Sequence, residues 1–221
     1  SKKILKNKNT TLILGLLRTD EKKVFNSLVF LNFKGDVVYS YDKIKLVPFG
    51  EYIPFRQYLG SLTDMLAPKD FTSGKLKLNP TIYGFENIVT LICYEILFTD
   101  EIVRRLSKNT NLLINITNDA WFGKTIGPYQ HLALAKIKAV EFGLPIARVA
   151  NTGISAYISP YGEIIGKIPL DNKGVKTFDL IPSLNSTLYK IYGEYIFVFL
   201  ILILLVINTL YNFKFMEEEL N

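Results

Sequence analysis

The sequence predicts an α/β domain with a mixed sheet, followed by a membrane-spanning helix. Short apolar runs of strand type alternate with helical patterns in the middle of the chain and pair as hairpins at both ends, which is typical of layered α/β domains. The 221 residues are 49% hydrophobic, which is enough for a real core. A long apolar segment at 191–211 supplies the expected membrane helix.

The first 80 residues are expected to form strands, loops and one short helix. Apolar strand-type runs occupy 10–17, 24–33 and 37–41, a helix is expected at 55–66, and loops at 41–52 and 67–80. Lys34, Gly35 and Asp36 give a hairpin signal between the second and third runs. In the loop at 41–52, Pro48 and Gly50 break regular structure, so its charged side chains are expected to be held in a fixed conformation.

The middle of the chain alternates strands with helices. Buried strands are expected at 87–93 and 112–116, helices at 99–107 and 128–142, a loop at 118–123, and short strands at 146–150, 155–159, 163–168 and 176–180. Thr99 is the expected N-cap of the first helix, and Gly143 is expected to end the second. A hairpin turn is expected at 160–162.

The C-terminal region divides into a linker, a membrane helix and a tail. We expect a catalytic domain at 1–182, a linker at 183–190, a transmembrane helix at 191–211 and a polar tail at 212–221. The helix is long enough for a hydrocarbon core that needs about 20 residues. Tyr192, Tyr195 and Tyr211 lie near its ends, as interfacial aromatic residues do. The alternative is a core helix, but one apolar on all faces requires a large protein around it.

Composition excludes several classes of function. The net charge of +6 comes from scattered lysines without a basic helix or an aromatic-interleaved patch, so no nucleic-acid partner is expected. One cysteine excludes an internal disulfide and a cysteine-based metal cluster. We expect neither a metal nor a cofactor.

Cys93 is the only cysteine and ends an apolar strand-type run. A lone cysteine there is more often a core residue than a catalyst. A thiol nucleophile needs a nearby base or cation. His131, the sole histidine, lies in a predicted helix with nothing to place it beside Cys93, so a structural role is favoured. Lys43 and Glu51, in one pinned loop, suit oxyanion stabilisation and proton transfer, although loop pairs of this kind are usually solvent-exposed.

Three motifs favour Cys93 as a catalytic nucleophile over Cys93 as a core residue. They are Tyr-Asp-Lys-Ile-Lys-Leu-Val-Pro-Phe-Gly-Glu at 41–51, Ile-Cys-Tyr-Glu at 92–95, and Ile-Thr-Asn-Asp-Ala-Trp-Phe-Gly at 116–123 with Gly-Pro-Tyr-Gln-His at 127–131. Asn-Thr-Gly at 151–153 and the C-terminal helix accompany these motifs. With these features the chain resembles the apolipoprotein N-acyltransferases, a membrane-bound branch of the nitrilase (carbon-nitrogen hydrolase) superfamily.

The resemblance implies a four-layer αββα sandwich with a Glu–Lys–Cys catalytic triad. Cys93 matches the nucleophile, Lys43 the lysine that stabilises the oxyanion, and Glu51 a second, supporting glutamate. Tyr94 and Glu95 match residues needed for activity, and Asn118 and Trp121 are expected to support the site.

The implied reaction begins when a phospholipid acylates the cysteine. The acyl chain then passes from the thioester to the α-amino group of a diacylglyceryl-cysteine lipoprotein. The implied location is the bacterial inner membrane, with the catalytic domain on the periplasmic face, so the bilayer is itself a partner.

One element of the family pattern is not found in the sequence. The triad glutamate of the family lies upstream of the lysine motif, and no matching Pro-Glu segment precedes Thr10. Asp20 and Glu21 lie in a polar turn and are poor substitutes. We therefore expect the C-terminal part of an enzyme, with a sandwich incomplete at its N-terminal side, which depends on an N-terminal partner segment for its base. The alternatives are a membrane-tethered nitrilase-type amidase, and an inactive fragment or one half of a split enzyme.

Overall fold

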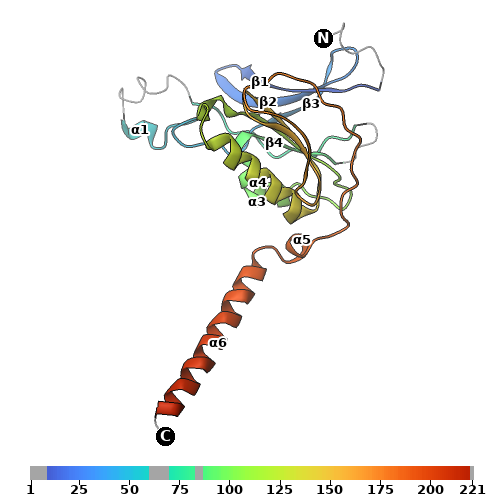
Figure 1. The fold of residues 1–221 in the computed structure, drawn as a ribbon. Coiled ribbons are helices and arrows are strands. Elements are labelled where there is room, and N and C mark those ends of the chain that lie inside the picture. The colour runs from blue at the N-terminus through green and yellow to red at the C-terminus, as the bar shows by residue number, and fades with distance from the viewer. Residues whose placement is uncertain (1–8, 60–69, 83–86, 220–221) are drawn as a thin grey trace.

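Two β-sheets form the centre of the protein in a computed structural model that describes residues 9–59, 70–82 and 87–219 (Figure 1). The first sheet is antiparallel, in the order β1 (Leu12–Asp20), β2 (Lys23–Leu31) and β3 (Val37–Asp42). Its hairpin between β2 and β3 confirms the prediction. The polar turn predicted at Asp20 and Glu21 is also present, where Asp20 pairs with Lys23.

The second sheet has five strands and is mixed. Its order is β4 (Val89–Ile92), β5 (Leu113–Asn118), β6 (Ile146–Asn151), β7 (Ser155–Ile158) and β8 (Ile164–Ile168). The pairs β4–β5 and β5–β6 are parallel, whereas β6–β7 and β7–β8 are antiparallel. The carboxyl ends of β4, β5 and β6 therefore meet at one edge, where open α/β sheets place their ligand sites.

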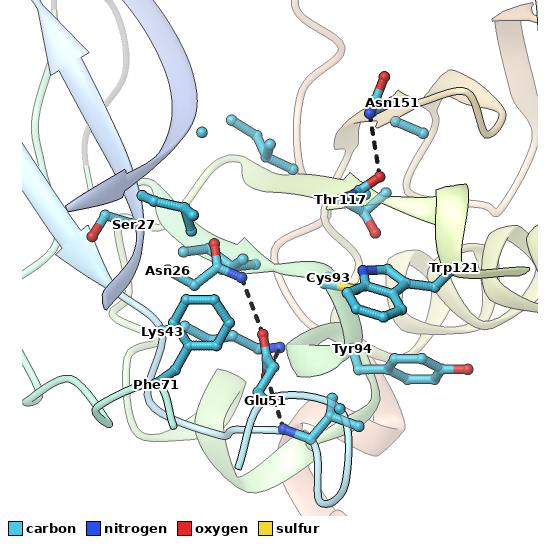
Figure 2. A pocket seen from close by; sticks show the side chains of 18 of the residues that line it. Asn26, Ser27, Lys43, Glu51, Phe71, Cys93, Tyr94, Thr117, Trp121 and Asn151 are labelled. Carbon is cyan, nitrogen blue, oxygen red and sulfur yellow. Dashed lines mark hydrogen bonds and ion pairs between the residues drawn. The ribbon is translucent and has the colours of Figure 1, made fainter. Parts of the chain in front are cut away.

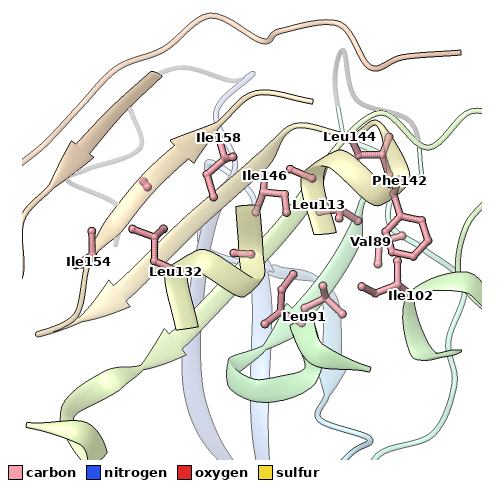
Figure 3. Close-up of a cluster of buried hydrophobic side chains, with 14 residues drawn as sticks. Val89, Leu91, Ile102, Leu113, Leu132, Phe142, Leu144, Ile146, Ile154 and Ile158 are labelled. Atoms are coloured by element: carbon pink, nitrogen blue, oxygen red, sulfur yellow. The ribbon is translucent and has the colours of Figure 1, made fainter. Parts of the chain in front are cut away.

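The two sheets pack face to face, and helices cover the outer face of the five-stranded sheet. Between the sheets, Leu28 and Phe30 of β2 meet Ile92 and Ile114, all buried. On the other face, the helix α4 (Gly127–Phe142) packs its apolar side on β4, β5 and β6 (Figure 3). The described residues thus form three of the four layers expected for a nitrilase-like sandwich: sheet, sheet and helix.

The helices agree only in part with the sequence expectation. The helix α4 and its end at Gly143, with φ of 62°, are as predicted. The helix α3 (Thr99–Val103) is shorter than predicted, and its N-cap is Phe98 and not Thr99. The Thr99 hydroxyl instead accepts a hydrogen bond from Lys138 (2.7 Å). Of the helix expected at 55–66, α1 (Arg56–Leu59) is present, and the part beyond residue 59 lies outside the described residues.

The strand predicted at 176–180 is wrong. This segment forms no ladder and is held instead by side chains. Phe178 stacks on Tyr157 with ring centroids 5.2 Å apart, and the Tyr157 hydroxyl accepts a hydrogen bond from the backbone of Ile181. A tight turn closes at Gly162, whose nitrogen donates to the carbonyl of Ser159, as predicted for 160–162.

The C-terminal region contains two helices instead of one. The helix α5 (Leu188–Tyr192) is separated from α6 (Tyr195–Glu219) by Gly193, whose φ of 55° ends α5. The predicted helix therefore starts too early, and α6 continues into the expected tail. The expected linker is attached to the domain, since the nitrogen of Leu184 donates a hydrogen bond to the carbonyl of Gly143 at the end of α4. Figure 1 shows α6 extending away from the sheets.

Candidate active site

A pocket of ≈ 720 Å³ lies between the two sheets, at the carboxyl ends of β4, β5 and β6. Six residues singled out in the sequence line it: Lys43, Glu51, Cys93, Tyr94, Asn118 and Trp121. Much of the remaining wall is apolar, with Leu16, Leu17, Phe71, Ile116, Phe122 and Val149. Glu95, the seventh predicted residue, does not line the pocket and is fully buried beside it. The fold thus brings segments that are far apart in the sequence to one cavity.

Cys93 lies just after the strand, not within it as the sequence suggested. The strand β4 ends at Ile92, and Cys93 opens a 3-10 helix, η1 (Cys93–Leu97). Its φ of 53° is in the left-handed region, which costs a residue other than glycine about 1 to 3 kcal/mol. The Cys93 carbonyl accepts a hydrogen bond of 3.2 Å from the side-chain amide of Asn115. A partly exposed, free thiol at a strained turn of this kind suits a nucleophile.

Lys43 and Glu51 form a buried ion pair on the opposite wall of the pocket. Lys43 Nζ lies 2.5 Å from Glu51 Oε2, and the lysine is 1% exposed. Glu51 also accepts hydrogen bonds from the Asn26 amide (3.1 Å) and the Val47 nitrogen (2.8 Å), and Figure 2 shows Asn26 and Lys43 directed at it. A buried pair is tolerated when such additional hydrogen bonds satisfy it. The ammonium group is therefore held in place at the wall of the pocket.

Glu95 connects the lysine loop to the cysteine turn. Its Oε1 accepts hydrogen bonds from the nitrogens of Ile44 (2.7 Å) and Lys45 (3.1 Å) and from the Tyr41 hydroxyl (2.9 Å), and its Oε2 accepts from the Ile92 nitrogen (2.9 Å). Burial raises the pKa of Glu95, and the backbone donors oppose that effect. Burial and the neighbouring Glu95 also raise the pKa of Tyr41, so its hydroxyl keeps the proton that it donates.

A buried polar network lies behind the pocket, and the sequence reasoning missed it. Arg148 donates to Asn115 Oδ1 (2.5 Å) and to Asp119 Oδ2 (2.7 Å), and Asp119 Oδ1 lies 2.9 Å from His131 Nδ1. The His131 ring is buried and stacks on Tyr94, with centroids 4.9 Å apart. The signal available in the sequence was Asn115 and Arg148, polar residues inside otherwise apolar strands.

The chemistry of the pocket also depends on which carboxylates line it and on whether any side chains are arranged to hold a metal ion. Among the residues that the structure describes, Glu51 is the only carboxylate that lines the pocket. Asp20 and Glu21 lie at the β1–β2 turn and do not line it. Within the same described ranges, no cluster of three histidine, cysteine, aspartate or glutamate side chains is arranged to hold a metal ion.

Curated relatives share the sequence of most of this chain. An apolipoprotein N-acyltransferase of Allorhizobium ampelinum is 41% identical over 180 residues, which is 76% of this chain and 34% of the relative. Another, of Rhodopseudomonas palustris, is 36% identical over 85% of this chain and 37% of its own length. The chain thus spans about a third of the length of the curated relatives that it matches.

Solved structures and a family model agree with the fold described above. An amidase from Nesterenkonia sp. AN1 has 20% sequence identity and a TM-score of 0.54, and the match covers 77% of this chain and 63% of the amidase. At this identity the likeness concerns the fold, which is nitrilase-like. Residues 2–186 match the model of the carbon-nitrogen hydrolase family. The chain belongs to the carbon-nitrogen hydrolase family.

Proposed function

We propose that this chain is the catalytic part of an apolipoprotein N-acyltransferase, which carries an acyl group as a thioester on Cys93. The observation that carries the proposal is the pocket itself, in which a thiol and a buried ammonium group lie on opposite walls and much of the remaining wall is apolar. Leu17, Trp121 and Val149 are 64%, 77% and 56% exposed at this wall. Such a surface suits an acyl chain better than a small polar amide.

The proposed reaction has two steps. The Cys93 sulfur attacks the ester carbonyl of a phospholipid, a sulfur–carbon bond forms, and the carbon–oxygen bond breaks. The thiol proton passes by way of a base to the departing alkoxide, which leaves as lysophospholipid. The α-amino group of a diacylglyceryl-cysteine lipoprotein then attacks the thioester, so that a nitrogen–carbon bond forms and the sulfur–carbon bond breaks. The proton that the amine loses passes to the sulfur, which restores the thiol.

Lys43 has the clearest role among the neighbours of Cys93. Each step passes through a tetrahedral intermediate with a negative oxygen, and a positioned cation in a site with little water stabilises that charge strongly. Glu51, held by three donors, keeps the ammonium group in position. We propose that Glu95 also keeps the ammonium group in position, because it binds the backbone of the loop that carries Lys43.

The general base is proposed to be a carboxylate outside the described residues. Glu51 is the only candidate within them, and both of its oxygens already accept hydrogen bonds. We therefore assign Glu51 to the support of Lys43 and not to proton transfer.

We infer attachment to a bilayer from α6. Its segment Tyr195–Asn212 has the length and composition to cross a membrane, and none of that segment is buried in the protein. A helix of the soluble core would be covered, whereas this one exposes apolar side chains on every face. We propose the inner membrane, with the domain on the periplasmic face, because both proposed substrates are lipids.

Two acyl donors test the proposal. The purified chain in detergent is mixed with p-nitrophenyl octanoate, whose leaving group departs without protonation, or with a phospholipid, and the adduct is located by intact mass and peptide mapping. We expect the activated ester to acylate Cys93, the adduct to disappear in Cys93→Ala, and glycinamide to remove it as octanoyl-glycinamide.

The outcomes separate the parts of the proposal. Absence of an octanoyl adduct on Cys93 would overturn the assignment of the nucleophile. An efficient phospholipid adduct on the chain alone would show that the chain supplies its own base. Hydrolysis of small amides with release of ammonia, without acyl transfer to an amine, would favour an amidase.

A further inference from the structure

The backbone of Cys93 is strained and depends on neighbours to hold it. Its left-handed φ of 53° is unfavourable for a residue with a side chain. On one side, Glu95 Oε2 binds the nitrogen of Ile92. On the other side, the amide of Asn115, which is fully buried in β5, donates to the carbonyl of Cys93 at 3.2 Å. The position of the thiol therefore depends on the orientation of the Asn115 amide.

Arg148 determines that orientation. Its Nη1 donates to Asn115 Oδ1 at 2.5 Å, and a guanidinium group has only donors. The oxygen of the Asn115 amide must therefore face β6, and its NH2 group must face β4, where it meets the carbonyls of Cys93 (3.2 Å) and Leu91 (3.4 Å). A flipped amide would set donor against donor at Arg148.

Arg148 is itself held in place by hydrogen bonds and by an ion pair with Asp119. Its Nη2 donates to Asp119 at 2.7 Å and its Nε donates to the carbonyl of Ile154 at 3.3 Å, and both charged side chains are 0% exposed. Burial lowers the pKa of Arg148 and Asp119 opposes this. Burial acts to raise the pKa of Asp119, but the hydrogen bond to His131 and the charge of Arg148 hold it below its usual value. An arginine side chain stays protonated in proteins, and the lowered pKa keeps Asp119 ionised at neutral pH.

A buried ion pair alone is weak evidence for stability, since apolar residues of similar volume often serve as well. Here Arg148 is also linked through Asn115 to the carbonyl of the nucleophile, across the three adjacent parallel strands β4, β5 and β6. We propose that Arg148 is a positioning residue, which acts through Asn115 to hold the Cys93 turn so that the sulfur faces the acyl carbon and Lys43.

Two substitutions test this proposal while a positive charge stays beside Asp119. Arg148→Lys keeps a positive charge beside Asp119, but a single ammonium group cannot reproduce the fork that also orients Asn115. Asn115→Asp still accepts from Arg148, but it presents an oxygen where the amide donated to the Cys93 carbonyl. Lys138→Met is the matched control, because Lys138 is also a buried cation with hydrogen bonds, and it lies away from the pocket, against Thr99 and Glu141.

The readout is a ratio of two rate constants on Cys93 at pH 7.5: acylation by p-nitrophenyl octanoate and alkylation by iodoacetamide. Acylation needs the sulfur aligned with the oxyanion donors, whereas alkylation needs only an accessible thiolate. Small misplacements cost acyl transfer about tenfold to a hundredfold. We expect a fall of that size in the ratio for Arg148→Lys and Asn115→Asp, and no change for Lys138→Met, with melting temperature recorded for each variant.

The inference rests on Cys93 as the proposed nucleophile. Different results would overturn the proposed function and the positioning role of Arg148. If the unmodified chain shows no acylation of Cys93, the proposed function is wrong. If the unmodified chain is acylated and both variants keep its ratio while their melting temperatures fall, Arg148 is only structural and the inference is overturned. A matching fall in the ratio for Lys138→Met would overturn it as well.

Discussion

The Oε1 atom of Glu95 lies 2.7 Å from the backbone nitrogen of Ile44, which is 51 residues earlier in the chain. Through this bond and the one from Lys45, a single buried carboxylate holds the loop that presents Lys43 against the turn that presents Cys93. The two walls of the pocket are therefore connected through the buried carboxylate of Glu95.

The first prediction is that Glu95→Gln separates these walls. A glutamine has one acceptor oxygen, so its NH2 group would face either the Ile92 nitrogen or the donors from the lysine loop, and a buried donor would lose its partner. Such a loss costs about 1 to 3 kcal/mol. We expect a lower melting temperature and a slower octanoyl acylation of Cys93. Glu163→Gln, at an exposed glutamate, serves as the control, and equal behaviour of the two variants would contradict the proposed role.

The second prediction concerns the charge of Lys43. Lys43→Met keeps the length of the side chain but removes the cation, and removal of one donor to an oxyanion typically costs a factor of about 10² to 10³. We expect acylation of Cys93 by p-nitrophenyl octanoate to fall by that factor, while alkylation by iodoacetamide changes far less, because it forms no oxyanion. Lys75→Met, at an exposed lysine nearby in the chain, controls for net charge. A similar loss in both variants would argue against a role for Lys43 in stabilising the oxyanion.

The sequence predicted most strands and α4 because their hydrophobic patterns are local, and it predicted Lys43, Glu51 and Cys93 because they occur in short contiguous motifs. It missed the contacts that depend on three dimensions. Asn115 and Arg148 are 33 residues apart and meet only because β5 and β6 are adjacent and parallel. The wrong strand at 176–180 has a related cause, since β propensity does not reveal whether a partner strand is free.

The third prediction concerns the close approach of Gly153 to Asp119. A Cβ atom at Gly153 would lie 2.3 Å from Asp119 Oδ2, so Gly153→Ala must displace the carboxylate that pairs with Arg148. Overpacking of this kind costs about 1 to 3 kcal/mol, or roughly 2 to 4 °C in melting temperature for each kcal/mol. Gly174→Ala is the control, because its Cβ would lie 3.6 Å or more from every neighbour. Unchanged stability in Gly153→Ala would contradict the tight packing of the segment on Asp119.

The fourth prediction is a pH dependence at Asp42, which joins β3 to Arg18 of β1. Burial acts to raise the pKa of Asp42, but hydrogen bonds from Arg18 and Ser27 hold it below its usual value of 3.8. A depressed carboxyl pKa stabilises the fold above the unfolded value, and the contribution is lost as the pH falls through the folded value. The difference in melting temperature between the unmodified chain and Asp42→Asn should be full at pH 7 and shrink below pH 3.8. A difference that stayed constant across this range would contradict the assignment.

The fifth prediction concerns α5 and the bilayer. Leu188, Ile191 and Tyr192 lie three and four residues apart, so they share one face of α5, and they are 70%, 59% and 55% exposed. The opposite face is fixed to the domain by the Tyr189 ring, which packs on Phe142. Because α6 begins only three residues after α5, a membrane that holds α6 should bring the exposed face of α5 to its headgroup layer.

A tryptophan probe tests this arrangement. In a Trp121→Phe background, which removes the single native tryptophan, Leu188→Trp is reconstituted into vesicles that contain lipids brominated near the headgroup. We expect strong quenching and a blue-shifted emission. Leu78→Trp is the control, because Leu78 is 93% exposed in a segment that is hydrogen-bonded to β3 through Lys77. Equal quenching at the two positions would mean that the domain does not rest on the bilayer through α5. Weak quenching at both would mean that the domain stands clear of the membrane surface.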